Sequence, residues 1–203
     1  FLPIWATHSE EELVMSRKAA LALEAAAEAL IEAAQPGATL SDIQMAILSA
    51  TVPYGMDATA VGGILYTGEE GGRGTRWMGR GFPPLVIKQG YLVHTEMVRH
   101  YGHMRGDVQL TVSVGQPTEE IATLARLARE SYEAGLQQIR PGNTFQALCD
   151  AMAEPIRRAG AWHITPLVHL MNPNEARSMM REGLWENYTG VKERFGEARV
   201  LGS

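Results

Sequence analysis

The sequence is poor in the features that mark secreted, membrane-spanning and zinc-cluster proteins. It has a single cysteine, Cys149, in 203 residues. One thiol excludes an internal disulfide framework and a cysteine zinc cluster, and it fits a reducing compartment, so we expect a cytoplasmic protein. No apolar run approaches the roughly 20 residues that a membrane-spanning helix needs, and we expect no membrane partner.

The sequence also lacks a long basic run. The formal net charge is -5 and the isoelectric point is about 5.7, which argues against nucleic acid as a partner. The apolar fraction is 45% and the charged fraction is 20%, close to globular averages. This balance excludes wholesale disorder, so we expect a folded protein that does not bind nucleic acid.

Four helices are predicted by their N-terminal caps and by the Pro-Gly steps between them. Residues 10–34 are rich in Ala, Leu and Glu, with Ser9 as the N-cap, and a second helix reaches about Ala50. A third helix is expected over about 118–139, where two glutamates stand in the first turn, and a fourth over about 144–158.

Two strands, 91–98 and 107–114, are predicted by the alternation of their side chains. The apolar residues of the second strand are Val108, Leu110, Val112 and Val114, with a polar residue before each of them. This period of two predicts one apolar face and one polar face. Glycines in the connection between the two strands favour a β-hairpin.

One short sequence pattern occurs twice. Pro36-Gly37-x-Thr39 recurs as Pro141-Gly142-x-Thr144, 105 residues later (141 minus 36). In both copies a long predicted helix precedes the Pro-Gly step, and a shorter helix capped by the threonine follows it. Pro-Gly followed by threonine is also common helix punctuation. The spacing is too long for a solenoid and favours a protein built from two related halves.

Two carboxylates stand on the predicted strand pair, Glu96 on the first strand and Asp107 on the second, 11 residues apart (107 minus 96). Neighbouring antiparallel strands can bring such side chains within reach of each other. Divalent cations prefer anionic oxygen ligands, and a buried carboxylate without a cation is costly. The pair therefore indicates a metal site, and the alternative is a pair of ordinary strand-end acids.

The repeated step and the strand pair together resemble the pita-bread metallohydrolases. This is the family of methionine aminopeptidase, aminopeptidase P, prolidase and creatinase, and the resemblance is closest to the Xaa-Pro peptidase and creatinase branch. In that family two metal-binding aspartates lie eleven residues apart, the second within Asp-x-x-Arg-Thr-x-x-x-Gly. Asp107, Thr111 and Gly115 match this pattern. Glu96 stands where the family has Asp, and Leu110 stands where it usually has Arg.

The resemblance implies an α+β pita-bread fold with two pseudo-symmetric αα-β halves around an antiparallel sheet. It implies a hydrolase in which a metal-activated hydroxide attacks an amide or related C–N bond of a peptide or small molecule. Glu96, Asp107 and His169 would be the metal ligands for two divalent ions of Mn, Zn, Co or Fe. His163 is the second choice for the histidine ligand and is assigned a catalytic role. A homodimer is also implied.

Two further histidines, His100 and His103, lie around the predicted hairpin near Glu96, as does His94. We expect His100 and His103 to contact substrate. The alternatives are that these histidines bind a metal by themselves, or that they form an ordinary polar hairpin tip, since loops are generically polar.

The sequence departs from the family at its C-terminal side, because the family's two further metal-binding glutamates have no counterpart after His169. Together with a first residue that is Phe, this predicts that residues 1–203 are a single pita-bread domain that is incomplete at both ends. Two other functions stay open on the same scaffold. One is a non-catalytic binding domain with a degenerate site, and the other is a lyase or another small-molecule hydrolase.

Overall fold

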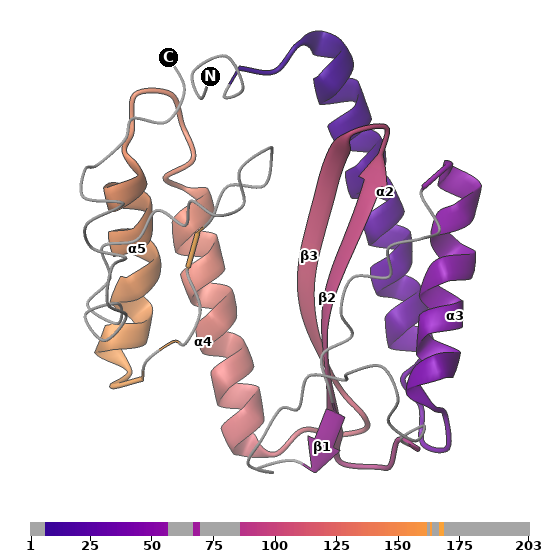
Figure 1. Ribbon diagram of the computed structural model, residues 1–203. Helices are drawn as coiled ribbons and strands as arrows, with labels where there is room; N and C mark the ends of the chain where they lie inside the picture. Colours follow the sequence, from indigo (N-terminus) through magenta and orange to yellow (C-terminus); the bar gives the residue numbers. More distant parts are fainter. Residues whose placement is uncertain (1–6, 57–66, 70–85, 162, 164–166, 169–203) are drawn as a thin grey trace, which may run out of the picture. The chain divides into compact units, whose positions relative to one another are not determined.

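The chain divides into two units, Phe1–Thr118 and Glu119–Ser203. The computed structural model describes residues 7–56, 67–69, 86–161, 163 and 167–168 (Figure 1). The elements of the first unit are α2 (Glu10–Ala33), α3 (Leu40–Thr51), the 3-10 helix η1 (Val52–Tyr54), β1 (Thr67–Glu69), β2 (Tyr91–Tyr101) and β3 (Met104–Ser113). The elements of the second unit are α4 (Glu119–Leu136) and α5 (Phe145–Arg158).

Helix α2 begins where its cap predicts. The backbone N–H of Glu12 donates to Ser9 Oγ at 3.2 Å, and the backbone N–H of Ser9 donates to Glu12 Oε2 at 2.8 Å, which together form a capping box. Small and apolar residues at helical spacing form its buried stripe: Ala19, Ala22, Leu23, Ala26 and Leu30.

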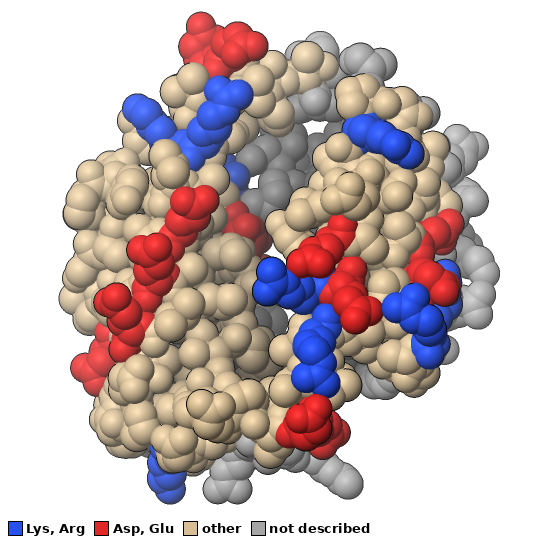
Figure 2. All heavy atoms as spheres, turned by 180° about the vertical axis from the view of Figure 1, so that it is seen from behind, with Lys and Arg blue, Asp and Glu red and all other residues tan. Residues whose placement is uncertain are grey.

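The opposite side of α2 is a solvent-facing surface. Glu24, Glu28 and Glu32 are exposed and follow one another at a spacing of four residues. Figure 2 shows a diagonal row of acidic side chains over this helix. An amphipathic surface helix carries its charges away from the core in this way.

The repeated Pro-Gly-x-Thr step builds the same turn in each unit. Gly37 and Gly142 have φ values of 93° and 84°, a left-handed conformation that glycine adopts without strain. Thr39 then caps α3 by accepting the N–H of Asp42, and Thr144 caps α5 by accepting the N–H of Ala147. The local similarity of the two halves is thereby confirmed.

The sheet of the first unit has the order β1-β2-β3, and all its pairs are antiparallel. Tyr101 pairs with Met104, so β2 and β3 form the predicted hairpin, with Gly102 and His103 in the turn. The strands extend closer to the turn than the predicted ranges of 91–98 and 107–114.

The two faces of the hairpin differ in what they contact. Val93 and Met97 of β2 are buried in one core with Leu30 of α2 and Ile43 of α3, and the apolar face of β3 packs against it. Figure 1 shows α2 between the hairpin and α3. The even-numbered residues of β2 and the odd-numbered residues of β3 therefore lie on the other face, where Glu96 and Asp107 stand.

In the second unit α4 and α5 pack on each other at a glycine. A Cβ atom on Gly135 would lie 2.6 Å from Met152 Cγ, so the two helices approach closely there. Helix α5 continues past Pro155 to Arg158. In the parts of both units that the structure describes, no helix is long and apolar enough to cross a membrane.

Candidate metal centre

Glu96 and Asp107 lie on the same face of the β2–β3 hairpin. Glu96 pairs with Gln109, and Asp107 pairs with Val98, so the two carboxylates are diagonal neighbours across the strands. Cα atoms in this relation are about 7–8 Å apart, and longer side chains bridge the gap. The register therefore lets the two carboxylates converge on one ion, and the longer side chain of Glu96 extends its reach.

The carboxylate of Asp107 is buried, and its two oxygens have different surroundings. Its side chain is 5% exposed. Oδ2 lies 3.0 Å from Nη2 of Arg105, whereas Oδ1 is buried and has no hydrogen-bond partner among the residues that the structure describes. A buried anionic oxygen without a donor costs free energy, which a cation would recover. Oδ1 of Asp107 is therefore suited to be one ligand of a divalent metal ion.

Arg105 is a residue of this face that sequence reasoning missed. It stands two positions before Asp107 on β3 and opposite His100 on β2, and its side chain is 13% exposed. The alternation of side chains along a strand places residues i and i+2 on one face, and this was the signal that could have found it.

His94 lies on the same face, two residue pairs further from the hairpin turn than Glu96. Its Nδ1 is 2.8 Å from Oγ1 of Thr111, the residue directly opposite. Burial lowers the pKa of His94, because the desolvated imidazolium is disfavoured. The neutral ring is the form that binds metals or accepts a proton.

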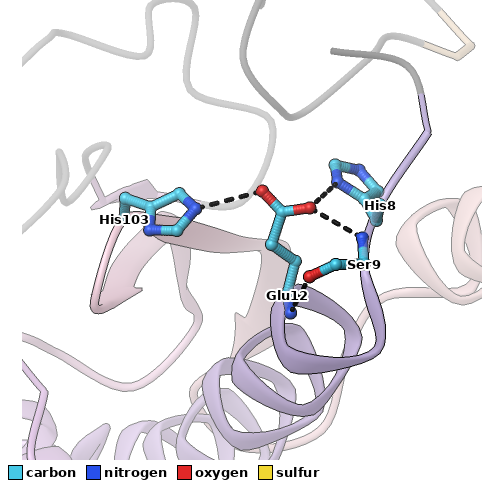
Figure 3. A network of polar contacts seen from close by, with 4 residues as sticks. All are labelled: His8, Ser9, Glu12 and His103. Atoms are coloured by element: carbon cyan, nitrogen blue, oxygen red, sulfur yellow. Dashed lines mark hydrogen bonds and ion pairs between the residues drawn. The ribbon is translucent and has the colours of Figure 1, made fainter. Parts of the chain in front are cut away.

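The two histidines that were expected to contact substrate lie in different places. His100 is opposite Arg105, on the face that carries Asp107. His103 lies in the hairpin turn, beyond Tyr101 at the end of β2, and five residues of strand span about 17 Å from Glu96 to that end. Its Nε2 is 3.2 Å from Oε1 of Glu12, so the ring contacts the start of α2 (Figure 3).

The contact of His103 belongs to a small polar network around Glu12. His8 Nδ1 lies 3.5 Å from Glu12 Oε2, the oxygen that also accepts the N–H of Ser9, and Figure 3 shows the two imidazoles on opposite sides of the carboxylate. The Ser9 N–H, and after it His103, hold the pKa of the Glu12 carboxyl below its usual value. The network ties the hairpin turn to the helix start.

Because the pKa of Glu12 is lowered by folding, its contribution to stability is present above the unfolded pKa and is lost as pH falls through the folded pKa. A Glu12→Gln variant should be less stable than the wild type at about pH 7, and the difference should shrink as pH falls below about 4. Urea unfolding over this pH range measures it. Glu24→Gln, on the exposed side of α2, is the matched control. A difference that is constant with pH would contradict the prediction.

The other two predicted ligands lie outside the described part of the first unit. His169 lies outside the described residues, and His163 belongs to the second unit. Over the described residues, no three His, Cys, Asp or Glu side chains are grouped so as to hold a metal ion. Of the predicted ligands, Glu96 and Asp107 are therefore the two that the described structure places on one face.

Comparison with known proteins decides the family. The profile of metallopeptidase family M24 matches residues 14–190, which is most of the chain. The chain belongs to family M24. The resemblance inferred from Asp107, Thr111 and Gly115 is confirmed, as is the α+β pita-bread fold.

Solved structures agree with this M24 assignment at the level of the fold. The chain is similar to the X-Pro aminopeptidase of Thermotoga maritima (19% identity, TM-score 0.65) and to the prolidase of Pyrococcus furiosus (21%, 0.67). It is also similar to the methionine aminopeptidase of Thermotoga maritima (22%, 0.65). The matches cover 78%, 78% and 75% of this chain, and 44%, 46% and 62% of those proteins. A comparison with curated protein sequences found no match.

Proposed function

We propose that this M24 chain contributes to a metal-dependent hydrolase that cleaves an amide C–N bond of a peptide. The observation that carries the proposal is the buried carboxylate of Asp107, whose Oδ1 has no hydrogen-bond partner in the described structure and lies on the face that carries Glu96. The chain belongs to a metallopeptidase family, and an anionic oxygen of this kind is a suitable ligand for a divalent metal ion.

In this proposal Glu96, Asp107 and His169 hold the ion, and each supplies one of the donor types that Mn, Zn, Co and Fe accept. When bound, a divalent ion acts as a Lewis acid that polarises a carbonyl and makes water more acidic. His94 is the base within reach of this face. In the tautomer whose Nδ1–H donates to Thr111 Oγ1, Nε2 is the atom that would take up a proton.

The remaining parts of the assignment are also proposals. His163 is proposed to have a catalytic role, and His100 and His103 are proposed to contact the substrate. The X-Pro aminopeptidase and prolidase neighbours support a substrate with a bond before proline. The chain spans less than half of either, so the remaining ligands of a complete centre would come from outside the matched part. A cytoplasmic homodimer stays a prediction.

A second candidate function is a non-catalytic binding domain of the same fold. Arg105 supports it, because the guanidinium already supplies Asp107 with a cation at 3.0 Å. Glu96 in place of Asp and Leu110 in place of Arg support it too, since both depart from the family pattern.

Metal content separates the two functions. Purified protein is dialysed against Mn²⁺, Zn²⁺ or Co²⁺ and then against metal-free buffer, its bound metal is measured by plasma mass spectrometry, and hydrolysis of Xaa-Pro dipeptides is followed. The hydrolase requires retained metal, and peptide cleavage that a chelator abolishes. Protein that retains no metal and cleaves none of the dipeptides would refute the proposal that these residues hold the metal ion of a hydrolase, and it would leave the binding domain. A dipeptide without proline is the control for specificity.

A further inference from the structure

The candidate centre contains a cation of its own. Arg105 and Asp107 form an ion pair on one strand face, with 3.0 Å between Nη2 and Oδ2 and side chains that are 13% and 5% exposed. A guanidinium stays protonated at any pH at which proteins function, so this charge is permanent. The two side chains are also fixed relative to each other, because residues i and i+2 of a strand project from the same face.

The pair makes the two oxygens of Asp107 unequal as metal ligands. Oδ2 accepts a charge-assisted hydrogen bond from Arg105, and Oδ1 accepts none in the described structure. An ion at Oδ1 can bind without breaking the pair. An ion at Oδ2 must displace the guanidinium or lie beside it, and two cations within a few ångströms repel each other strongly where water is excluded.

This inequality bears on how many ions the centre holds. In a two-metal centre the ions are about 3.5–4 Å apart, and a carboxylate that bridges them uses both of its oxygens. Asp107 can bridge only if the second ion displaces the guanidinium from Oδ2 or binds Oδ2 beside it. The two metal positions therefore differ in their affinity for an ion, although the family resemblance alone implies two ions.

We propose that Arg105 sets the metal stoichiometry of the centre by competing with the second ion for Oδ2 of Asp107. The inference rests on the proposed function. The first ion binds at Oδ1, on the face that carries Glu96, and leaves the ion pair intact. The second binds at least tenfold more weakly, because it must displace the guanidinium from Oδ2 or bind beside its positive charge. Arg105 is in this sense a positioning residue that acts through Asp107.

The experiment is a Mn²⁺ titration of the wild type and of two neutral variants, Arg105→Met and Arg105→Gln. Calorimetry gives the affinity of each step, and electron paramagnetic resonance distinguishes isolated Mn²⁺ from a spin-coupled pair. The wild type should show one tight step with an uncoupled signal. Both variants should bind the second ion at least tenfold more tightly and give a coupled signal at two equivalents. Either variant suffices if the other does not fold.

Two control variants test whether the positive charge of Arg105 is the cause. Arg105→Lys keeps the positive charge and should keep the wild-type pattern. Arg126→Met removes an exposed arginine that pairs with Glu119 on α4, and it should change nothing. A second affinity that is the same in wild type and neutral variants overturns the inference, as do two equally tight ions in the wild type, while the proposed hydrolase stands in both cases. Binding of no Mn²⁺ by any variant overturns both proposals.

Discussion

A Gly106→Val variant should lose about 3 kcal/mol of the free energy of unfolding, because no side chain fits between β3 and α2 at this position. A Cβ atom on Gly106 would lie 2.7 Å from Leu23 Cδ1, 3.2 Å from Ala19 Cβ and 3.4 Å from the backbone carbon of Ala19. The Leu23 methyl can rotate away, but the helix backbone cannot, and valine adds two further methyl groups. Urea unfolding measures the loss as a lower midpoint at an unchanged slope.

The matched control is Gln109→Val, which places the same residue at an exposed position of the same strand. It should change stability by no more than about 0.5 kcal/mol. Gly106→Ala should fall between the two, because only the Leu23 methyl is then overlapped. Equal stability of Gly106→Val and Gln109→Val would show that β3 does not rest on α2 at this point.

The helices could be predicted from sequence because their signals are local. Ser9 and Glu12 are three residues apart, as are Thr39 and Asp42, and each pair forms the capping box that begins its helix. The twofold period of 107–114 likewise predicts which side of β3 meets the core. Such signals need no knowledge of distant parts of the chain.

The contacts that shape the candidate site could not be predicted in the same way. His103 contacts Glu12 across 91 residues, and the approach of Gly106 to Leu23 depends on where the hairpin crosses α2. Neither contact has a local signal. The pairing of Arg105 with Asp107 does have a local sequence signal, since strand alternation puts the two residues on one face. Alternation does not predict that both side chains are buried.

The hairpin illustrates a further limit. The polar and glycine-containing stretch 99–106 reads as a connection, whereas the strands extend through most of it and leave only Gly102 and His103 in the turn. Strand pairing uses backbone N–H and C=O groups, which every residue but proline supplies. Side-chain composition therefore predicts the faces of a hairpin better than its length.

An Asp107→Asn variant should bind divalent metal at least about 100-fold more weakly than the wild type. Changes to residues that only support a metal ligand typically cost about 10–100-fold in affinity, and the loss of a direct anionic ligand should exceed that. Asparagine keeps the shape of the side chain but removes the charge that Oδ1 and Oδ2 share. It also removes a carboxylate partner of Arg105.

Thermal unfolding with and without Mn²⁺ measures this effect without requiring catalysis. A ligand present at 100 times its Kd stabilises the folded state by about 2.7 kcal/mol, and most of that gain should vanish in Asp107→Asn at the same concentration. Asp150→Asn changes an exposed carboxylate of α5 and should keep the full gain. If Mn²⁺ still stabilises the folded state of Asp107→Asn, the buried carboxylate pairs with Arg105 and is not a metal ligand. The centre would then have to lie elsewhere in the chain, because no other buried anionic oxygen in the described structure is without a hydrogen-bond partner.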